Sequence, residues 1–354
     1  MACSGSARRL GSRSGDTAYV GVAVGLTNPG RYADMFDGVQ LAFDQLNAKR
    51  TGGQPILALR RAPSAADSPV KIATAFRDDP SVVAVVGHTE SDATIAAAPV
   101  YADRDHNGRN PMVAVTPATS LQVTKVSPWI YRVNANVAEQ GRTLARYVAD
   151  SLHLQRSAVL YRNDPMGKDF VRAFTAEYNS KGGTVVERDP FTEQIGDFDG
   201  YARRLVMEKV PSVVVSGNPP QTRSVIHALH QAGGAPAVLA TNGPGASDTG
   251  DFKGLRYVLL FSPDRPVSSE GRDFVSAFKA RMNHAPDHWG ALGYDAAMMI
   301  GLAVHANGAD RSRIRDWFAA VGTARPHPGA TGAIAFDADR NPVNKSVLIG
   351  TVDK

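Results

Sequence analysis

Short apolar runs rich in β-branched residues recur along this chain, and they restrict its possible folds more than any other feature. The first spans Tyr19–Leu26 and another spans Val82–Val86, and neither alternates apolar with polar residues. Strands buried on both faces have this pattern, and such strands are typical of parallel sheets covered by helices. The runs therefore predict an α/β protein.

Segments with apolar residues at spacings of three and four separate these runs and are predicted to be helices. Over the first 120 residues the predicted strands are residues 19–26, 56–59, 82–86 and 112–115, and the predicted helices are residues 35–46, 68–77 and 91–101. Strands that alternate with helices are parallel and are joined by right-handed crossovers. This part of the chain is therefore predicted to form an open sheet of four strands.

The same alternation starts again after Val133 and predicts a second sheet of similar size. Its strands are expected at residues 157–161, 184–187, 212–216 and 237–240, with helices at residues 136–151, 168–180, 201–207 and 221–231. The last part of the chain has predicted strands at residues 257–261, 332–336 and 346–351, and predicted helices at residues 270–282, 290–305 and 311–321. Successive helices without strands between them fit a chain that returns to complete the first domain.

Composition narrows the class of protein further. The 354 residues are enough for about two domains, and the net charge of +5 comes from interspersed charges, which gives no support to a nucleic-acid partner. The single cysteine, Cys3, excludes a cysteine-based zinc site or an iron–sulfur cluster. No apolar run approaches the roughly 20 residues that span a bilayer. The histidines show no metal-ligand spacing, so no metal or cofactor is expected.

The usual catalytic motifs are missing from the sequence. It contains no Gly-x-Ser-x-Gly turn, no Gly-rich phosphate loop ending in Lys-Ser/Thr, and no His-Glu-x-x-His helix. The turn after the first strand, residues 25–30, does not match the dinucleotide-binding pattern Gly-x-Gly-x-x-Gly. We therefore expect a binding protein that is not an enzyme, with an α/β enzyme of unrecognised site as an alternative hypothesis.

Polar residues follow two predicted strands of the first sheet. Residues 87–91 (Gly-His-Thr-Glu-Ser) follow the third strand, and residues 116–120 (Thr-Pro-Ala-Thr-Ser) follow the fourth. Open α/β sheets bind ligands at the carboxyl ends of strands, where helix N-termini offer free N–H groups. We expect Ser91 to be the N-cap of the next helix and the two turns to hold an anion or an amino acid. Ordinary capping and turn formation is the alternative interpretation.

These segments resemble the leucine/isoleucine/valine-binding proteins. The resemblance rests on segments that occur in the family's order: residues 85–91, 96–101, 111–119, 131–133, 140–141, 160–167, 294–297 and 332–337. It covers nearly everything from Tyr19 onwards. It implies two doubly wound, mostly parallel α/β lobes joined by a three-strand hinge, the type I periplasmic binding fold. Residues 18–135 plus 264–331 would form the first lobe, and residues 136–263 plus 332–354 the second.

The resemblance also assigns residues to a ligand site between such lobes. In the first lobe, Ser91, Ala118 and Thr119 would hold the ligand's carboxylate and ammonium. In the second lobe, the ligand-facing positions are Met166, Asn218 and Asn242. Candidates for the walls of the site are His88, Tyr32 and Tyr161, for which ordinary packing is the alternative. Met166 stands where the family often has an aromatic residue, and no acidic residue accompanies Asn242, so the branched-chain specificity of the family is not implied.

The N-terminal residues 1–17 are rich in Ser, Gly and Arg and are expected to form a flexible tether. Their start, Met-Ala-Cys3-Ser-Gly, resembles a mature bacterial lipoprotein with lipid on the cysteine, although a stray exposed thiol is the alternative. The expected function is that of an extracytoplasmic, lipid-anchored protein that captures a small polar ligand, such as an amino acid, for an ABC permease. The alternative is the ligand-sensing module of a membrane signalling system.

Overall fold

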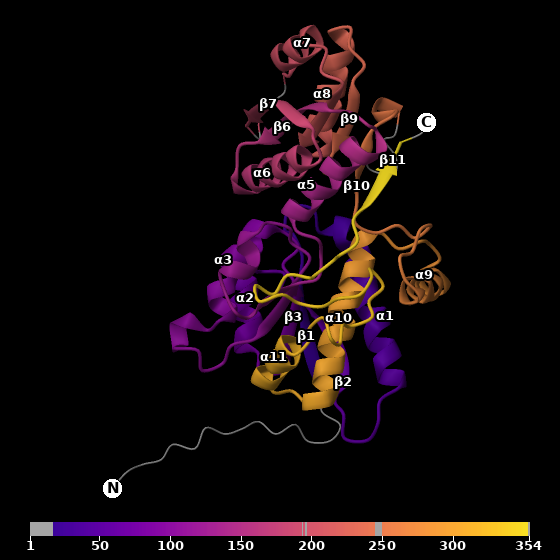
Figure 1. Ribbon diagram of the computed structural model, residues 1–354. Helices are drawn as coiled ribbons and strands as arrows, with labels where there is room; N and C mark the ends of the chain where they lie inside the picture. The colour runs from indigo at the N-terminus through magenta and orange to yellow at the C-terminus, as the bar shows by residue number, and fades with distance from the viewer. Residues whose placement is uncertain (1–16, 193, 195–196, 245–249, 353–354) are drawn as a thin grey trace. The chain divides into compact units, whose positions relative to one another are not determined.

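The computed structural model describes residues 17–192, 194, 197–244 and 250–352 (Figure 1). These residues form two compact units. Unit 1 runs to Asn134 and also holds Ser262–Lys345, while unit 2 holds Ala135–Phe261 and the residues from Ser346 on. The chain thus passes from one unit to the other three times. The predicted tether lies outside the described residues, except that Thr17 already belongs to the first strand.

Unit 1 is built on a parallel sheet of five strands in the order β2-β1-β3-β4-β5. The strands are β1 (Thr17–Ala23), β2 (Ile56–Arg61), β3 (Val82–Gly87), β4 (Val113–Thr116) and β5 (Ile130–Arg132). The helices are α1 (Ala33–Ala48), α2 (Pro69–Asp78), α3 (Ser91–Tyr101), α4 (Gln122–Lys125), α9 (Ser269–Met282), α10 (His288–Asn307) and α11 (Arg311–Ala319). The sequence predicted neither β5 nor α4.

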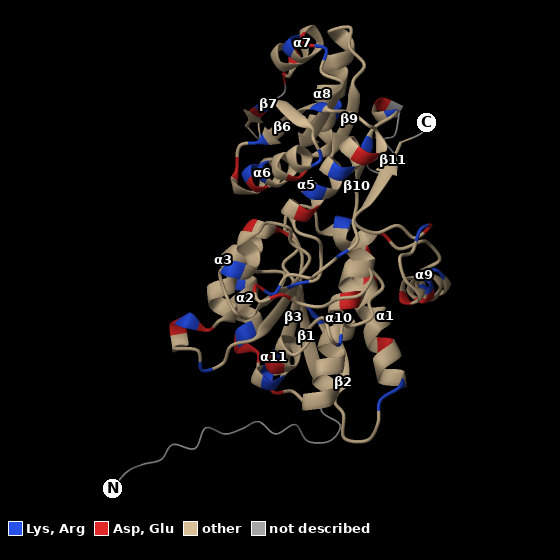
Figure 2. Ribbon diagram, viewed as in Figure 1, with Lys and Arg blue, Asp and Glu red and all other residues tan. Residues whose placement is uncertain are grey.

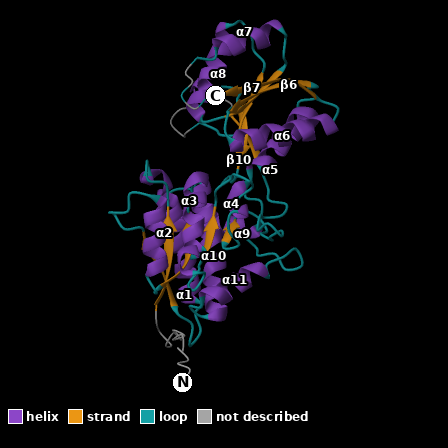
Figure 3. Cartoon of the chain, turned by 90° about the vertical axis from the view of Figure 1, so that its left-hand side faces the viewer, coloured by secondary structure: helices purple, strands orange, loops and turns teal. Residues whose placement is uncertain are grey.

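Both faces of this sheet are covered by helices (Figure 3), as the apolar runs predict. All six residues of β3 are buried, and neighbouring side chains enter different cores. Val86 packs in a core shared with α1, α10 and α11, whereas Val85 packs in a core shared with α2 and α3. Helices α1 and α10 approach closely at Gly38, where an added Cβ would lie 2.1 Å from the carbonyl oxygen of Gly290.

Unit 2 holds a sheet of six strands in the order β11-β10-β9-β8-β6-β7, parallel except for the antiparallel pair β10–β11. The strands are β6 (Arg156–Arg162), β7 (Thr184–Phe191), β8 (Ser212–Ser216), β9 (Ala237–Ala240), β10 (Arg256–Leu259) and β11 (Leu348–Thr351). The helices are α5 (Val137–Arg146, continued by a π-helical turn to Ser151), α6 (Pro165–Ser180), α7 (Asp199–Met207) and α8 (Pro219–Gln231). The predicted class of two mostly parallel α/β lobes is confirmed.

The segment of residues 332–345 differs from the prediction. It was expected to begin with a strand and to lie in the second lobe, but it belongs to unit 1 and forms only isolated bridges, one of them Phe336 to Pro342. The physical reason is burial in the unit 1 core: Ile334 is fully buried, and the Phe336 ring packs 5.0 Å from that of Tyr131. The apolar residues of this segment are therefore satisfied by packing and not by pairing in a sheet.

Charges of both signs are interspersed over the surface of each unit (Figure 2), as the sequence indicates. Among the described helices, none combines the length and the apolar character that crossing a membrane requires.

Candidate functional site

Two polar turns meet at the carboxyl edge of the unit 1 sheet. Strands β3 and β4 are neighbours, so residues 88–91 and 117–120 leave the sheet side by side. The backbone N–H of Ser120 donates to the Oγ of Ser91 at 3.2 Å, which joins the turns directly. The sequence expectation that they lie together is confirmed.

The N-cap of α3 is Glu90 and not the predicted Ser91. The backbone of Glu90 is extended (φ −106°, ψ 144°), whereas Ser91 is already the first helical residue. The Ser91 side chain therefore does not cap the helix but accepts from the other turn. Ser91 and Thr119 are both partly exposed at this edge.

A buried arginine holds the second turn from behind. The Arg132 guanidinium, fully buried at the end of β5, donates to the carbonyl oxygens of Ala118 and Ser120 and to Oδ1 of Asn341. Burial lowers the pKa of Arg132 to about 9. The N–H of Ala118 donates to the Thr116 hydroxyl at 3.0 Å. Both backbone polar groups of Ala118 are thus engaged within the protein, and the residue is 2% exposed.

His88 lies inside unit 1 and not on a wall of the site. Its side chain is 1% exposed, and Nε2 lies 2.9 Å from the hydroxyl of Tyr101. Burial lowers the pKa of His88 to about 4, so the imidazole is neutral at pH 7. The carbonyl oxygen of His88 accepts from the hydroxyls of Thr94 and Thr116. This residue supports the turn, and ordinary packing accounts for it.

Tyr32 brings a third polar group to the same edge. Its ring is buried against Trp289, with centroids 4.9 Å apart, and its hydroxyl donates to Oε1 of Glu90 at 3.3 Å. Burial raises the pKa of Tyr32, and the nearby Glu90 carboxylate raises it further. Neither Glu90 nor Trp289 was predicted from the sequence to be a site residue. For Glu90 the available signal was its place within the polar turn of residues 87–91.

In unit 2 the predicted residues also lie where strands end. Tyr161, partly buried near the end of β6, is paired with Ser216 at the end of β8. Asn218 and Asn242 follow β8 and β9, which are neighbours in the sheet. Met166, partly buried, is the second residue of α6. All four residues therefore lie at or just beyond the carboxyl ends of strands β6, β8 and β9.

The two asparagine side chains of unit 2 already have partners. Asn218 is the N-cap of α8, and it and Gln221 each accept from the other's backbone N–H at 2.9 Å in a reciprocal capping box. The Nδ2 of Asn242 donates to the carbonyl oxygen of Gly217 at 2.9 Å and so ties the turn after β9 to the turn after β8. Both amides thus stabilise the local backbone.

Comparison with known proteins decides the family. The family described as periplasmic binding protein matches residues 17–354. The chain belongs to this family. Its members bind solutes and are not enzymes, and the family name places them outside the cytoplasm. This agrees with the extracytoplasmic binding role that the sequence predicted.

Individual relatives share less than a quarter of their residues with this chain but align with most of its length. An amino acid binding protein of Pseudomonas aeruginosa is 24% identical over 316 residues, which is 85% of this chain and 83% of the relative. A substrate-binding protein of an ABC transporter from Desulfitobacterium hafniense, solved in complex with Leu, has a TM-score of 0.79 at 24% identity and covers 94% of this chain and 97% of its own. A solute-binding protein from Rhodopseudomonas palustris, solved with 3,4-dihydroxy benzoic acid, has a TM-score of 0.74 at 19% identity, covering 95% and 93%. At these identities the structures show the shared fold.

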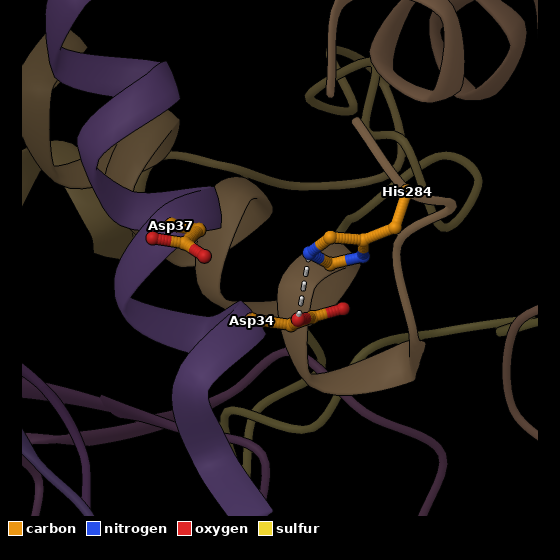
Figure 4. A group of neighbouring side chains, drawn as sticks. All are labelled: Asp34, Asp37 and His284. Carbon is orange, nitrogen blue, oxygen red and sulfur yellow. Dashed lines mark ion pairs between the residues drawn. The ribbon is translucent and has the colours of Figure 1, made fainter. Parts of the chain in front are cut away.

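One group of side chains in this periplasmic binding protein has metal-ligand character. Asp34, Asp37 and His284 each place a ligand atom within 4.8 Å of the others (Figure 4). Desolvation raises the pKa of Asp37, and the Asp34 charge raises it further. Asp34 already has protein partners, because Oδ1 lies 3.8 Å from Nε2 of His284 and Oδ2 accepts from the N–H of Asp287. The group is accounted for as a link between α1 and the connection from α9 to α10.

A pocket of about 770 Å³ lies within unit 2, away from the predicted site residues. It is lined by one side of α8, with Arg223, His227 and His230, and by acidic residues that include Asp199 and Asp251. None of the nine residues predicted from the sequence lines it.

Proposed function

We propose that this protein is a solute-binding component of an ABC importer and captures an amino acid or a related small acid outside the cytoplasm. The observation that carries the proposal is the pair of polar turns, residues 88–91 and 117–120, joined to each other and fixed by Arg132 at the carboxyl edge of a parallel sheet. Family membership from residue 17 to the end of the chain supports a binding role.

A carboxylate is the group that we place at these turns. Leucine and 3,4-dihydroxy benzoic acid, found with the two solved relatives, share a carboxyl group although the rest of each molecule differs. Hydroxyl groups such as those of Ser91 and Thr119 donate to carboxylates, and a charge-assisted hydrogen bond is about twice as strong as a neutral one.

Unit 2 supplies the remaining ligand contacts in this proposal. Tyr161 and Met166 would contact the ligand directly, whereas Asn218 and Asn242 would act through the backbone turns that they hold. A ligand that contacts both units favours the conformation in which both contacts are made, and a permease can recognise that conformation. This proposal predicts that the ligand makes the solution particle more compact, which small-angle scattering measures.

We also propose that Cys3 carries a lipid. Its sequence context resembles a mature lipoprotein, and Cys3 itself lies outside the described residues. A native host expressing the full-length precursor should attach labelled fatty acid to the protein, and Cys3→Ser should abolish the label. Lack of label with Cys3 intact would remove the anchor and leave the binding role in place.

The binding role is tested by identifying and measuring the ligand. Mass spectrometry of small molecules released by denaturation, followed by thermal-shift screening of amino acids, amides and organic acids, should yield a compound that is released chemically unchanged. Calorimetry should then show that Ser91→Ala and Thr119→Ala each weaken binding by about 1.5–3 kcal/mol. Unchanged affinity in both variants would contradict the site assignment.

A further inference from the structure

We propose that Glu90 binds a cationic nitrogen of the ligand, so that the site selects compounds carrying an ammonium or related cation over plain carboxylic acids. This inference rests on the proposed function and specifies the chemical class of its ligand. It is carried by three properties of Glu90: the way its side chain is held, its lack of a basic partner, and its exposure beside Ser91.

Neighbouring residues hold the Glu90 side chain in position. An added Cβ on Gly25 would lie 2.4 Å from Oε1 of Glu90, so the carboxylate lies directly against this glycine. The N–H of Gly25 donates to the Thr89 hydroxyl at 2.9 Å, which fixes that loop against the turn. Oε1 also accepts from the buried hydroxyl of Tyr32. The carboxylate is thereby oriented before any ligand arrives.

The orientation of Glu90 is not explained by helix capping. Glu90 is the N-cap residue of α3, but its side chain makes no capping hydrogen bond. Carboxylates usually stabilise this position by accepting from the free N–H groups of the first turn. Here the side chain turns instead towards Tyr32 and Gly25. It therefore does not accept from the N–H groups of the first turn of α3.

The charge of Glu90 also has no cationic partner among the residues that the structure describes. None of the ion pairs among the described residues includes Glu90. The nearby Arg31 lies instead over the Trp289 ring, at 5.9 Å from its centroid. Tyr32 occupies one lone pair of Oε1, and an ionised carboxylate has about four acceptor positions. Glu90 is exposed, so a ligand can approach its side chain.

The two kinds of polar group at this edge would then bind different parts of the ligand. The hydroxyls of Ser91 and Thr119 suit a carboxylate, whereas the fixed carboxylate of Glu90 suits a cation and repels a second anion. An α-amino acid carries both charges on neighbouring atoms. A benzoate or an aliphatic acid has no cation to pair with Glu90, and the carboxylate of that acid would be repelled by the carboxylate of Glu90.

The test compares Glu90→Gln with Asp92→Asn in the full chain. Glutamine keeps an Oε1 that accepts from Tyr32 and removes only the charge, while Asp92 is an exposed carboxylate in the same first turn that has no part in the site. The probes are the twenty amino acids, agmatine, 3-methylbutylamine, 4-methylpentanoate, benzoate and 3,4-dihydroxybenzoate, together with any compound that co-purifies. Thermal shift selects the strongest binder, and calorimetry measures its Kd with each variant.

The expected result is a strongest binder that carries a cationic nitrogen, whose Kd rises about 10- to 100-fold in Glu90→Gln and changes less than about twofold in Asp92→Asn. A strongest binder without a cationic nitrogen overturns the inference and leaves the proposed function standing. A cationic binder that the two variants bind equally well also overturns it. If no probe and no co-purified compound binds, the proposed function fails and the inference falls with it.

Discussion

The carboxyl edges of the two sheets carry similar residues and use them differently. In unit 1, Ser91 and Thr119 are partly exposed on turns that the buried Arg132 holds from behind. In unit 2, the amides of Asn218 and Asn242 are engaged in capping and in joining two turns. Polar residues after a strand therefore do not by themselves identify a ligand site. The more informative feature is a buried polar group whose hydrogen bonds fix the exposed turn.

The largest effect is expected from removing this support. Arg132→Met leaves the buried carbonyl oxygens of Ala118 and Ser120 without their donor, and each unsatisfied group costs about 1–3 kcal/mol. We therefore expect the free energy of unfolding to fall by about 3 kcal/mol or more in urea denaturation. The control is Arg172→Met in unit 2, where an exposed arginine pairs with Asp169 and the change should stay within about 0.5 kcal/mol. Equal losses in the two variants would contradict a special role for Arg132.

A pH dependence follows from His88 in the core of unit 1. Its pKa is about 4 in the folded protein and about 6.5 when unfolded, so on acidification the unfolded state takes up the proton first. The free energy of unfolding should therefore fall as the pH drops below about 6.5, with His88 contributing about 2 kcal/mol between pH 7 and pH 5.

The measurement is the difference in stability between pH 7 and pH 5 for variants with one histidine replaced. His88→Gln removes the titration and keeps an amide near Tyr101, so its stability should depend less on pH than that of the wild type. His230→Gln, at an exposed position of unit 2, should behave as the wild type does. The same pH dependence in all three proteins would show that His88 does not titrate as its burial implies.

A smaller effect tests the structural role of the unit 2 edge. Asn218→Ala removes one half of the capping box of α8, which should lower the free energy of unfolding by about 1 kcal/mol. Asn218→Ser should retain most of the stability because serine is also a good N-cap residue. If alanine were tolerated as well as serine, the side chain would not be acting as a cap, and a direct ligand contact would become the better explanation.

The smallest effect is expected at Asn242. Its Nδ2 donates to the carbonyl oxygen of Gly217 at 2.9 Å and to the neighbouring Thr241 hydroxyl at 3.2 Å, both at an exposed position, so Asn242→Ala should cost about 0.5–1 kcal/mol of stability. Calorimetry with the strongest ligand should show a smaller loss of affinity than in Thr119→Ala. A larger loss than in Thr119→Ala would reverse the comparison and place the main recognition in unit 2.

The sequence predicted most of the fold because buried parallel strands leave a strong pattern. Elements of three or four residues, such as β5 and α4, are too short to show a period. The segment from residue 332 on has apolar residues typical of a strand, yet it packs against rings of unit 1 without sheet partners. Such a choice depends on tertiary neighbours that no local pattern contains.

The sequence predicted that the two polar turns of unit 1 lie together, but it did not predict the surroundings of the individual side chains. The turns of Ser91 and Thr119 were found from their place after strands, whereas the burial of His88 depends on Tyr101, thirteen residues later. Arg132 lies within residues 131–133 of the family resemblance, but a charged residue in a short apolar run does not indicate which carbonyl groups it will contact. Glu90 could not be predicted as the N-cap because its neighbour Ser91 belongs to a more usual capping residue type.

The central claim is that ligand recognition lies at the carboxyl edge of the unit 1 sheet, and hydrogen–deuterium exchange of the full chain with its strongest binder tests it most directly. The account predicts the greatest slowing of exchange in peptides covering residues 88–93 and 117–121, with less at residues 216–219 and 241–243. Slowing confined to residues 223–230, which line the pocket on α8, or its absence from both unit 1 turns, would contradict it.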